Sequence, residues 1–252
     1  VELALACGLK PMVTLHHFTD PLWLARAGGW ENPRAIEYFA RFTRRVVEAL
    51  GDRVSLWCTV NEPIVYAYSG FLEGIFPPGV HSLPRTLRVL KNLLLAHGRS
   101  YRIIHALQNN VQVGIAHHMQ VMLPANPQSA ADRRAAAIVD QIANRVTLEA
   151  TLHGRLTPLI GLGEEAPELI DTADYIGLNY YSTARVAFDA RRPQDLFSRR
   201  FFDPHGELSE NTWQGQPYGE INPQGLYLAL KRLGQYHKPS YITENGVPDA
   251  SV

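Results

Sequence analysis

The sequence contains little cysteine, no long apolar run and no excess of charge of either sign. Its 252 residues include two cysteines, Cys7 and Cys58, which are too few for a disulfide framework. Its 24 basic and 24 acidic residues balance, so no net charge directs it to nucleic acid or a membrane surface. The apolar runs are too short to cross a bilayer. We therefore expect a globular protein with neither nucleic acid nor membrane as a partner, and we favour the cytoplasm.

Several sequence motifs that mark cofactor or metal chemistry are also absent. No glycine-rich loop opens a helix as in dinucleotide-binding proteins, and there is no C-x-x-C, H-E-x-x-H or G-x-S-x-G motif. The histidine pairs 16–17 and 117–118 lie on expected strands, so the two members of each pair point to opposite faces. We expect no cofactor and no metal. The arginine-rich stretch 185–200 is typical of a solvated loop more than of an anion site.

Apolar runs alternate with helical patterns along the chain. The runs are continuous, which is typical of a parallel sheet covered on both faces. Strands that alternate with helices indicate βαβ units, and no linker divides residues 1–252, so we expect one domain. Residues 183–217 form a long polar segment of the kind that is often functional. The expected strands are 11–18, 54–60, 111–116, 174–179 and 240–243, and the expected helices follow Asn32-Pro33, cover 85–108 and 129–153, and follow Asn222-Pro223.

Polar side chains gather where the expected strands finish. In (β/α) barrels and in open doubly wound sheets, active sites are built at this carboxyl edge. The site can therefore be placed before its chemistry is named. The strand ends carry, in order, His16-His17, Asn61-Glu62, His117-His118, Asn179-Tyr180-Tyr181 and Glu244-Asn245.

Two carboxylates at two strand ends, Glu62 and Glu244, indicate an acid paired with a base or nucleophile. Cleavage of a glycosidic bond needs such a pair, with His and Asn to hold hydroxyl groups. The leaving oxygen must be protonated and the developing oxocarbenium ion needs an anion beneath it, so the two environments must differ. The simpler alternatives are that Glu62 caps a helix and that Glu244 lies in a turn.

Other polar and aromatic residues have structural alternatives too. His17 could be a buried core histidine, and we expect His97 to be structural because it lies on the apolar stripe of its helix. His117 and His118 could line a pocket or do nothing. Trp30 and Trp57 fit packing better than a sugar platform, as Cys58 fits a small core residue. Tyr180 should point away from the pocket by alternation.

The two glutamates lie in the short segments TVNEP (59–63) and ITENG (242–246). These segments resemble the acid/base and nucleophile motifs of glycoside hydrolase family 1, the β-glucosidase family. Further matches occur in the family's order along nearly the whole chain: MVTLHHF (12–18), GGW (28–30), FPPG (76–79), AHGRSY (96–101), DYIGLNYY (174–181) and NPQGLY (222–227). The resemblance implies an α/β fold, a partial (β/α)8 TIM barrel.

The resemblance also implies roles for individual residues. Glu62 would be the general acid/base and Glu244 the nucleophile of a retaining β-glycosidase that hydrolyses terminal β-D-glycosides by double displacement. Asn61 would hold the sugar 2-hydroxyl and His17 would bind the glycone. Tyr181 would hydrogen-bond the nucleophile. Asn179 lies beside it in the same motif and is also expected to bind substrate.

The sequence departs from the family at several points. The family's sugar-binding Gln, the Arg beside the nucleophile and the closing Glu and Trp contacts are missing, while Gly219 and Ile64 stand where many members have Trp. We expect the chain to cover about strands 3–7 of the barrel. By itself it would then be nearly inactive and could self-associate through exposed sheet edges. A non-catalytic sugar-binding relative and a 6-phospho-β-glycosidase remain alternatives.

Overall fold

The computed structural model describes residues 1–157, 165–210 and 217–248. These residues fall into two compact units. The first comprises Val1–His117 and Val146–Gly177, and the second comprises His118–Arg145 and Leu178–Val252. The expectation of a single domain stays a prediction.

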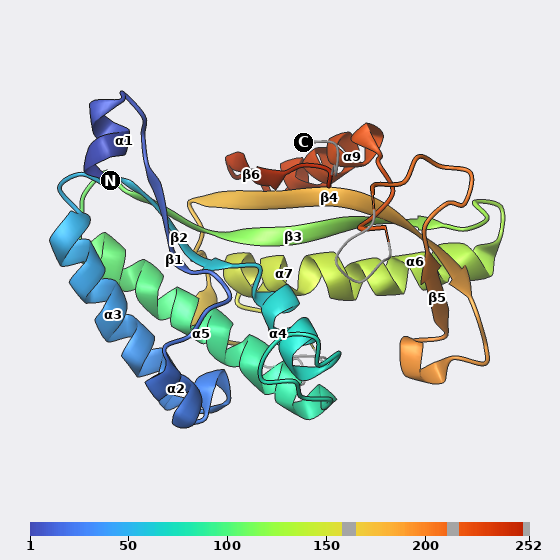
Figure 1. Cartoon of the computed structure of the whole chain (residues 1–252), viewed down its shortest axis with the longest axis horizontal. Helices are drawn as coiled ribbons and strands as arrows, with labels where there is room; N and C mark the ends of the chain where they lie inside the picture. The colour runs from blue at the N-terminus through green and yellow to red at the C-terminus, as the bar shows by residue number, and fades with distance from the viewer. Residues whose placement is uncertain (158–164, 211–216, 249–252) are drawn as a thin grey trace. The chain divides into compact units, whose positions relative to one another are not determined.

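The first unit contains two complete strands and most of the helices of the described chain (Figure 1). Its strands β1 and β2 are parallel, and β2 is also parallel to the beginning of β3, as the continuous apolar runs predict. Its elements are α1 (Glu2–Ala6), β1 (Met12–His16), α2 (Leu22–Arg26), η1 (Gly29–Glu31), α3 (Arg34–Leu50), β2 (Leu56–Asn61), α4 (Pro63–Phe71), α5 (Leu83–Leu107), the start of β3 (Gln112–Pro124), α7 (Val146–His153), η3 (Pro167–Leu169) and the start of β4 (Tyr175–Phe188).

Helices α3 and α5 lie side by side and cover this part of the sheet (Figure 1). Helix α3 begins at Arg34 with Pro33 as its N-cap residue and no side-chain capping bond, so the expected N-cap role of Asn32 is wrong by one residue. The Asn32 side chain instead accepts a hydrogen bond from the N–H of Arg34. Between the two helices the buried hydroxyls of Thr43 and Ser100 are 2.9 Å apart and satisfy each other. The core contains Trp30, Phe39, Val60, Tyr66, Leu93, Leu94, Ile115 and Leu169, with Trp57 in a neighbouring cluster.

The second unit contains the remaining parts of β3 and β4 with two further strands. A small core of Met122, Val139 and Val186 joins β3, α6 and β4. The chain's strands are hydrogen-bonded in the order β1-β2-β3-β4-β5, and β6 pairs with β4. The other elements of the second unit are α6 (Ala130–Asp140), the π-helical turn η2 (Gln141–Arg145), η4 (Pro193–Asp195), β5 (Ser198–Phe201), α9 (Pro223–Leu233), η5 (Gly234–Tyr236) and β6 (Ser240–Asn245).

The sequence pattern was wrong about several element ends. Strands β3 and β4 are longer than expected, and the segment 183–217 contains the end of β4 and the antiparallel strand β5 instead of one long connection. The expected helix 129–153 is interrupted by the π-helical turn. In this turn the Asn144 side chain accepts a hydrogen bond from the N–H of Gln120 in β3 and donates one to its C=O. The side chain thus satisfies the backbone groups of Gln120 that a neighbouring strand would otherwise satisfy. Residues 211–216 of the segment lie outside the described residues.

Candidate active site

Glu62 lies at the junction of β2 and α4. All of β2 is buried, and Glu62 itself is 5 % exposed. Its backbone has φ 43° and ψ 60°, the left-handed region, and its N–H donates to the carbonyl of Ala116 at 2.8 Å. This conformation costs a non-glycine residue on the order of 1–3 kcal/mol and is found mainly at functional sites. The junction therefore fixes the direction of the Glu62 side chain at a cost in free energy.

Glu62 occupies the N-cap position of α4, but its side chain does not cap the helix. Helix α4 begins at Pro63, and the Glu62 side chain makes no capping hydrogen bond to the first turn, all of which the structure describes. Pro63 needs no such partner, because it lacks an N–H and suits the first helical position. The presence of a carboxylate between Asn61 and Pro63 therefore needs another explanation.

Asn61 and His17 meet beside Glu62 in the first unit. The Asn61 Nδ2 is 3.3 Å from the His17 Nε2, which accepts if the amide donates. Asn61 is buried, whereas His17 is exposed, so His17 is not a core histidine. The two strand ends thus bring together two of the side chains that the sequence predicts to bind sugar.

Two histidines and two tryptophans of this unit, His97, His117, Trp30 and Trp57, are buried in the core. Burial lowers the pKa of His97 to about 4, and its Nδ1 lies 2.7 Å from the Thr59 hydroxyl. Burial likewise lowers the pKa of His117 to about 3, and its Nδ1 lies 2.9 Å from the hydroxyl of Thr147. The buried indoles donate to side chains: Trp30 to Asp20 and Trp57 to Gln108. The packing interpretation of His97, Trp30 and Trp57 is confirmed.

Glu244 and Tyr181 meet in the second unit. The Tyr181 hydroxyl donates to the Glu244 Oε2 at 2.5 Å, and the ring of Tyr218 packs edge-on against Tyr181 at a centroid distance of 5.3 Å. Glu244 is half-buried and lies within β6, so the turn alternative is wrong. A phenol that donates to one oxygen of a carboxylate fixes the orientation of the whole group.

Strand alternation separates Tyr180 from its neighbours. The buried Asn179 accepts a hydrogen bond from the Thr243 hydroxyl at 2.5 Å. Tyr180 instead donates to the carbonyl of Asn222 at 2.7 Å, at the start of α9. Asn179 and Tyr181 thus contact β6 with their side chains, and Tyr180 is structural, as alternation predicts.

The residues singled out in the sequence form two groups, one in each unit. His17, Asn61 and Glu62 belong to the first, and Asn179, Tyr181 and Glu244 to the second. Their roles, and their union in one site, are proposals. Sequence reasoning missed Asp20 and Tyr66, which are hydrogen-bonded to each other beside the first group. Asp20 follows His16 by four residues, and Tyr66 follows Glu62 by four residues. This spacing alone does not indicate that Asp20 and Tyr66 are in contact, because the contact depends on how the loops fold.

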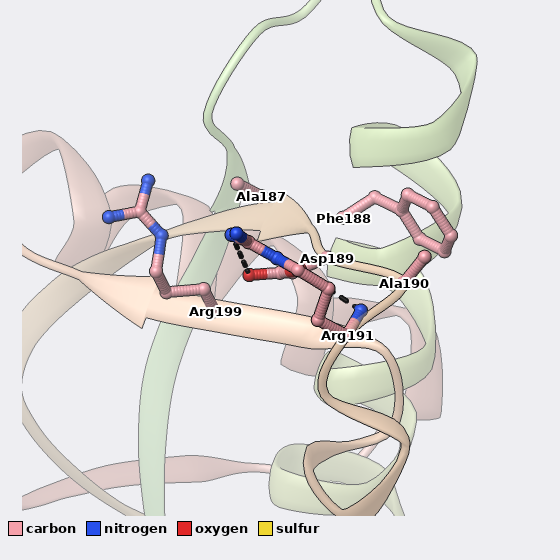
Figure 2. A pocket seen from close by; sticks show the side chains of 6 residues that line it. All are labelled: Ala187, Phe188, Asp189, Ala190, Arg191 and Arg199. Atoms are coloured by element: carbon pink, nitrogen blue, oxygen red, sulfur yellow. Dashed lines mark hydrogen bonds and ion pairs between the residues drawn. The ribbon is translucent and has the colours of Figure 1, made fainter.

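A surface pocket of about 620 Å³ in the second unit is lined by none of the residues of either group (Figure 2). Its arginines already have partners within the chain: Arg191 forms an ion pair with Asp189, and Arg199 stacks over the ring of Phe201. The stretch 185–200 begins in the end of β4 and finishes in β5, and residues 189–197 between the two strands form a connection that contains η4. Its charges are paired or exposed, as expected of a solvated surface. The pocket is lined by Ala187, Phe188, Asp189, Ala190, Arg191 and Arg199.

The sequence profile described as glycosyl hydrolase family 1 matches residues 1–251. The chain belongs to this family. It is similar to "Beta-glucosidase A" of Thermotoga maritima, at 30 % identity over 98 % of this chain and 56 % of the relative. It is also similar to a "6-phospho-beta-galactosidase" of Clostridium acetobutylicum, at 29 % identity over 95 % of this chain and 57 % of the relative.

The structure confirms the fold class within family 1. A solved family 1 glycoside hydrolase of Thermotoga maritima, complexed with a cyclophellitol analogue, superposes with a TM-score of 0.88 at 30 % identity. The match covers 100 % of this chain and 57 % of that chain. The fold is therefore α/β and part of a (β/α)8 barrel, and the chain spans little more than half the length of these relatives. No helix within the described ranges is long and apolar enough to cross a membrane.

Proposed function

We propose that this chain carries the acid/base and the nucleophile of a retaining β-glycosidase that hydrolyses terminal β-D-glycosides. The observation that carries the proposal is the 2.5 Å hydrogen bond from the Tyr181 phenol to Glu244 at the end of a barrel strand. A nucleophilic carboxylate must present one oxygen to the anomeric carbon along a defined line. A donor fixed on its other oxygen provides that direction.

The two glutamates would act in two steps. In the first, a Glu244 oxygen forms a bond to the anomeric carbon while the bond to the leaving oxygen breaks and Glu62 donates its proton to that oxygen. In the second, Glu62 removes a proton from water, the water oxygen bonds to the anomeric carbon, and Glu244 leaves as a carboxylate. This chemistry needs the two carboxyl groups about 5–5.5 Å apart.

His17 and Asn61 would hold the sugar during both steps. They lie at the ends of the neighbouring strands β1 and β2, where the Asn61 Nδ2 is 3.3 Å from the His17 Nε2, and Asn61 directly precedes Glu62 in the sequence. An amide donor at this position can strengthen its bond to the 2-hydroxyl as the transition state forms. The names of the relatives, a β-glucosidase and a hydrolase bound to a transition-state mimic, support the same substrate class.

A labelling experiment tests the assignment of Glu244. In 2-deoxy-2-fluoro β-glucosyl fluoride the 2-fluorine slows both steps, while the reactive fluoride leaving group keeps the first step faster than the second. The full-length protein, which here means this chain together with the remainder of the family 1 barrel, should therefore retain a covalent sugar on Glu244 that peptide mass spectrometry locates. Glu244→Gln should abolish both labelling and turnover, with a loss of at least about 10⁴-fold in kcat. The control is Glu207→Gln, an exposed glutamate of the same unit, which should react like the wild type. A label on another residue, or a product of inverted configuration, would refute the proposal.

A 6-phospho-β-glycosidase is the second candidate, because a relative named as a 6-phospho-β-galactosidase matches 95 % of this chain. Parallel assays with β-glucosides and their 6-phosphates distinguish the two. The absence of any turnover in the full-length protein would favour a non-catalytic sugar-binding relative. We further propose that the 252-residue chain by itself hydrolyses glycosides very slowly or not at all, because it spans about 56 % of its relatives' length.

A further inference from the structure

The carboxylate of Asp20 collects three hydrogen bonds from three different parts of the first unit. Its Oδ1 accepts from Trp30 Nε1 at 3.0 Å and lies 3.2 Å from His16 Nε2. Its Oδ2 accepts from the hydroxyl of Tyr66 at 2.5 Å. The Asp20 side chain is 12 % exposed, and all three partners are buried. Asp20 therefore joins the end of β1, the segment η1 and the helix α4.

The charge of Asp20 suits this arrangement. Burial alone would raise the pKa of Asp20, but hydrogen bonds from His16, Tyr66 and Trp30 and the charge interaction with His16 outweigh burial and hold it below its usual value. An ionised carboxylate accepts hydrogen bonds without donating any, which matches three donors. Charge-assisted hydrogen bonds of this kind are stronger than neutral ones. Asp20 is thus a charged link that joins β1, η1 and α4 through hydrogen bonds.

This link ends one helical turn from Glu62. The N–H of Tyr66 donates to the carbonyl of Glu62 at 3.1 Å and closes the first turn of α4. The left-handed backbone of Glu62 is unfavourable, so it persists only if its surroundings hold it. The Glu62 N–H is held by Ala116 on one side. On the other side the first turn of α4 is held by the side chain of Tyr66, and Tyr66 is held by Asp20.

We propose that Asp20 is a positioning residue that acts through Tyr66 to keep Glu62 in the orientation needed for proton transfer. The inference rests on the proposed function, because it assigns proton transfer to Glu62. Asp20 itself does not touch the sugar. Its loss lets the first turn of α4 shift, and a small displacement of an acid/base group is enough to slow proton transfer strongly.

The dependence of rate on the leaving group separates this role from a general loss of structure. A 2,4-dinitrophenyl β-glucoside has a leaving group that departs without protonation, whereas an alkyl β-glucoside requires a proton from Glu62. Values of kcat/KM for the two substrates report only the steps up to the glycosyl-enzyme. In Asp20→Asn and in Tyr66→Phe, kcat/KM for the alkyl glucoside should fall about tenfold or more beyond any fall for the dinitrophenyl glucoside.

Asp174→Asn is the matched control. Asp174 belongs to the same unit and also accepts three hydrogen bonds, from Tyr101, His105 and the N–H of Val113, but it precedes β4. Its substitution should lower the midpoint of thermal unfolding and change both kcat/KM values by one common factor. If Asp20→Asn does not fold, Tyr66→Phe alone decides, because it removes one hydroxyl and keeps the buried ring.

Two outcomes overturn different claims. Suppose that the wild type hydrolyses both glucosides, but that in Asp20→Asn and Tyr66→Phe kcat/KM falls by the same factor for both substrates, as in Asp174→Asn. Asp20 then does not position Glu62, and the proposed function stands. If the full-length wild type hydrolyses neither glucoside and takes no label on Glu244, the proposed function itself fails, and the inference about Asp20 fails with it.

Discussion

Histidine shows most clearly how position decides the role of a residue in this chain. His17 is exposed at the end of β1 and lies against Asn61, where it can reach a ligand. His97 has none of its surface exposed and lies against Thr59 inside the unit, and His117 is almost as deeply buried. Burial lowers the pKa of both buried rings, because the charged imidazolium cannot be hydrated there.

The buried histidines predict a loss of stability in acid. The pKa of His97 is about 4 in the folded protein, against about 6.5 in an unfolded chain. Between these values the unfolded state binds more protons, so the free energy of unfolding falls as the pH drops from 6.5 towards 4. For His97 the loss at pH 4 is on the order of 3 kcal/mol. His117 adds to it, with a folded pKa of about 3.

Urea unfolding at pH 7, 5.5 and 4.5 measures this effect. His97→Asn should have a shallower decline of unfolding free energy with falling pH than the wild type. The exposed His205→Asn serves as the control and should follow the wild type. Equal slopes for wild type and His97→Asn would show that His97 is protonated without penalty in the folded state.

The sequence shows where the candidate site residues lie but not how they are held. Glu62, Glu244 and Tyr181 stand out because polar residues at the ends of apolar strands are conspicuous. Asp20 and Tyr66 lie within a loop and a helix, and the sequence carries no sign that they meet at 2.5 Å. Their contact depends on how α4 packs against the loop after β1, which is a tertiary property.

At the scale of elements, close backbone approach explains a glycine in one of the family motifs. Gly98 belongs to AHGRSY (96–101) in α5, where glycine is normally unfavourable by about 1 kcal/mol relative to alanine. A Cβ at Gly98 would lie 2.6 Å from the carbonyl oxygen of Glu168 and 2.8 Å from Leu169 Cδ2. The helix can approach the segment η3 only because this side chain is absent.

Gly98→Ala should therefore destabilise the protein, although alanine is the better helix former. We expect a loss of about 1–3 kcal/mol in the free energy of unfolding, from overpacking against backbone. Gly234→Ala is the control, because its φ is −56° and its added Cβ would meet no atom of the described residues within 4 Å. It should change stability by less than about 0.5 kcal/mol. An increase in stability for Gly98→Ala would contradict the close approach of α5 and η3.

The errors in predicting elements have local physical causes. The end of β3 was placed before His117-His118 because polar residues usually end a strand, yet His117 is buried against Thr147 and the strand continues to Pro124. Strand β5 is short, and its arginines hide its pattern, so only its pairing with β4 reveals it. The parallel pairing of β1, β2 and β3 was predictable, because continuous apolar runs leave few alternatives.

At the scale of the whole molecule, the chain leaves sheet edges and apolar side chains exposed. Among the strands that the structure describes, β1 pairs with β2 only and β6 pairs with β4 only. Ile242 on β6 is 50 % exposed, and the exposed fractions of Leu3 and Trp23 are larger still. Open edges with apolar neighbours promote association between chains.

The purified 252-residue chain should therefore associate in a concentration-dependent way and show little glycosidase activity. Sedimentation velocity over a range of concentrations measures the association, and an aryl β-glucoside assay measures the activity. The full-length protein is the control for both. A stable monomer that hydrolyses the glucoside as fast as the full-length protein would show that the residues 1–252 are sufficient.

The proposed function requires Glu62 and Glu244 to face each other across one sugar. A crystal structure of the full-length protein trapped with a 2-deoxy-2-fluoro β-glucoside tests it most directly. The proposed function predicts a bond from a Glu244 carboxylate oxygen to the anomeric carbon and a Glu62 carboxyl group about 5–5.5 Å from that of Glu244. Carboxyl groups more than about 10 Å apart, or a sugar bound covalently to another residue, would contradict it.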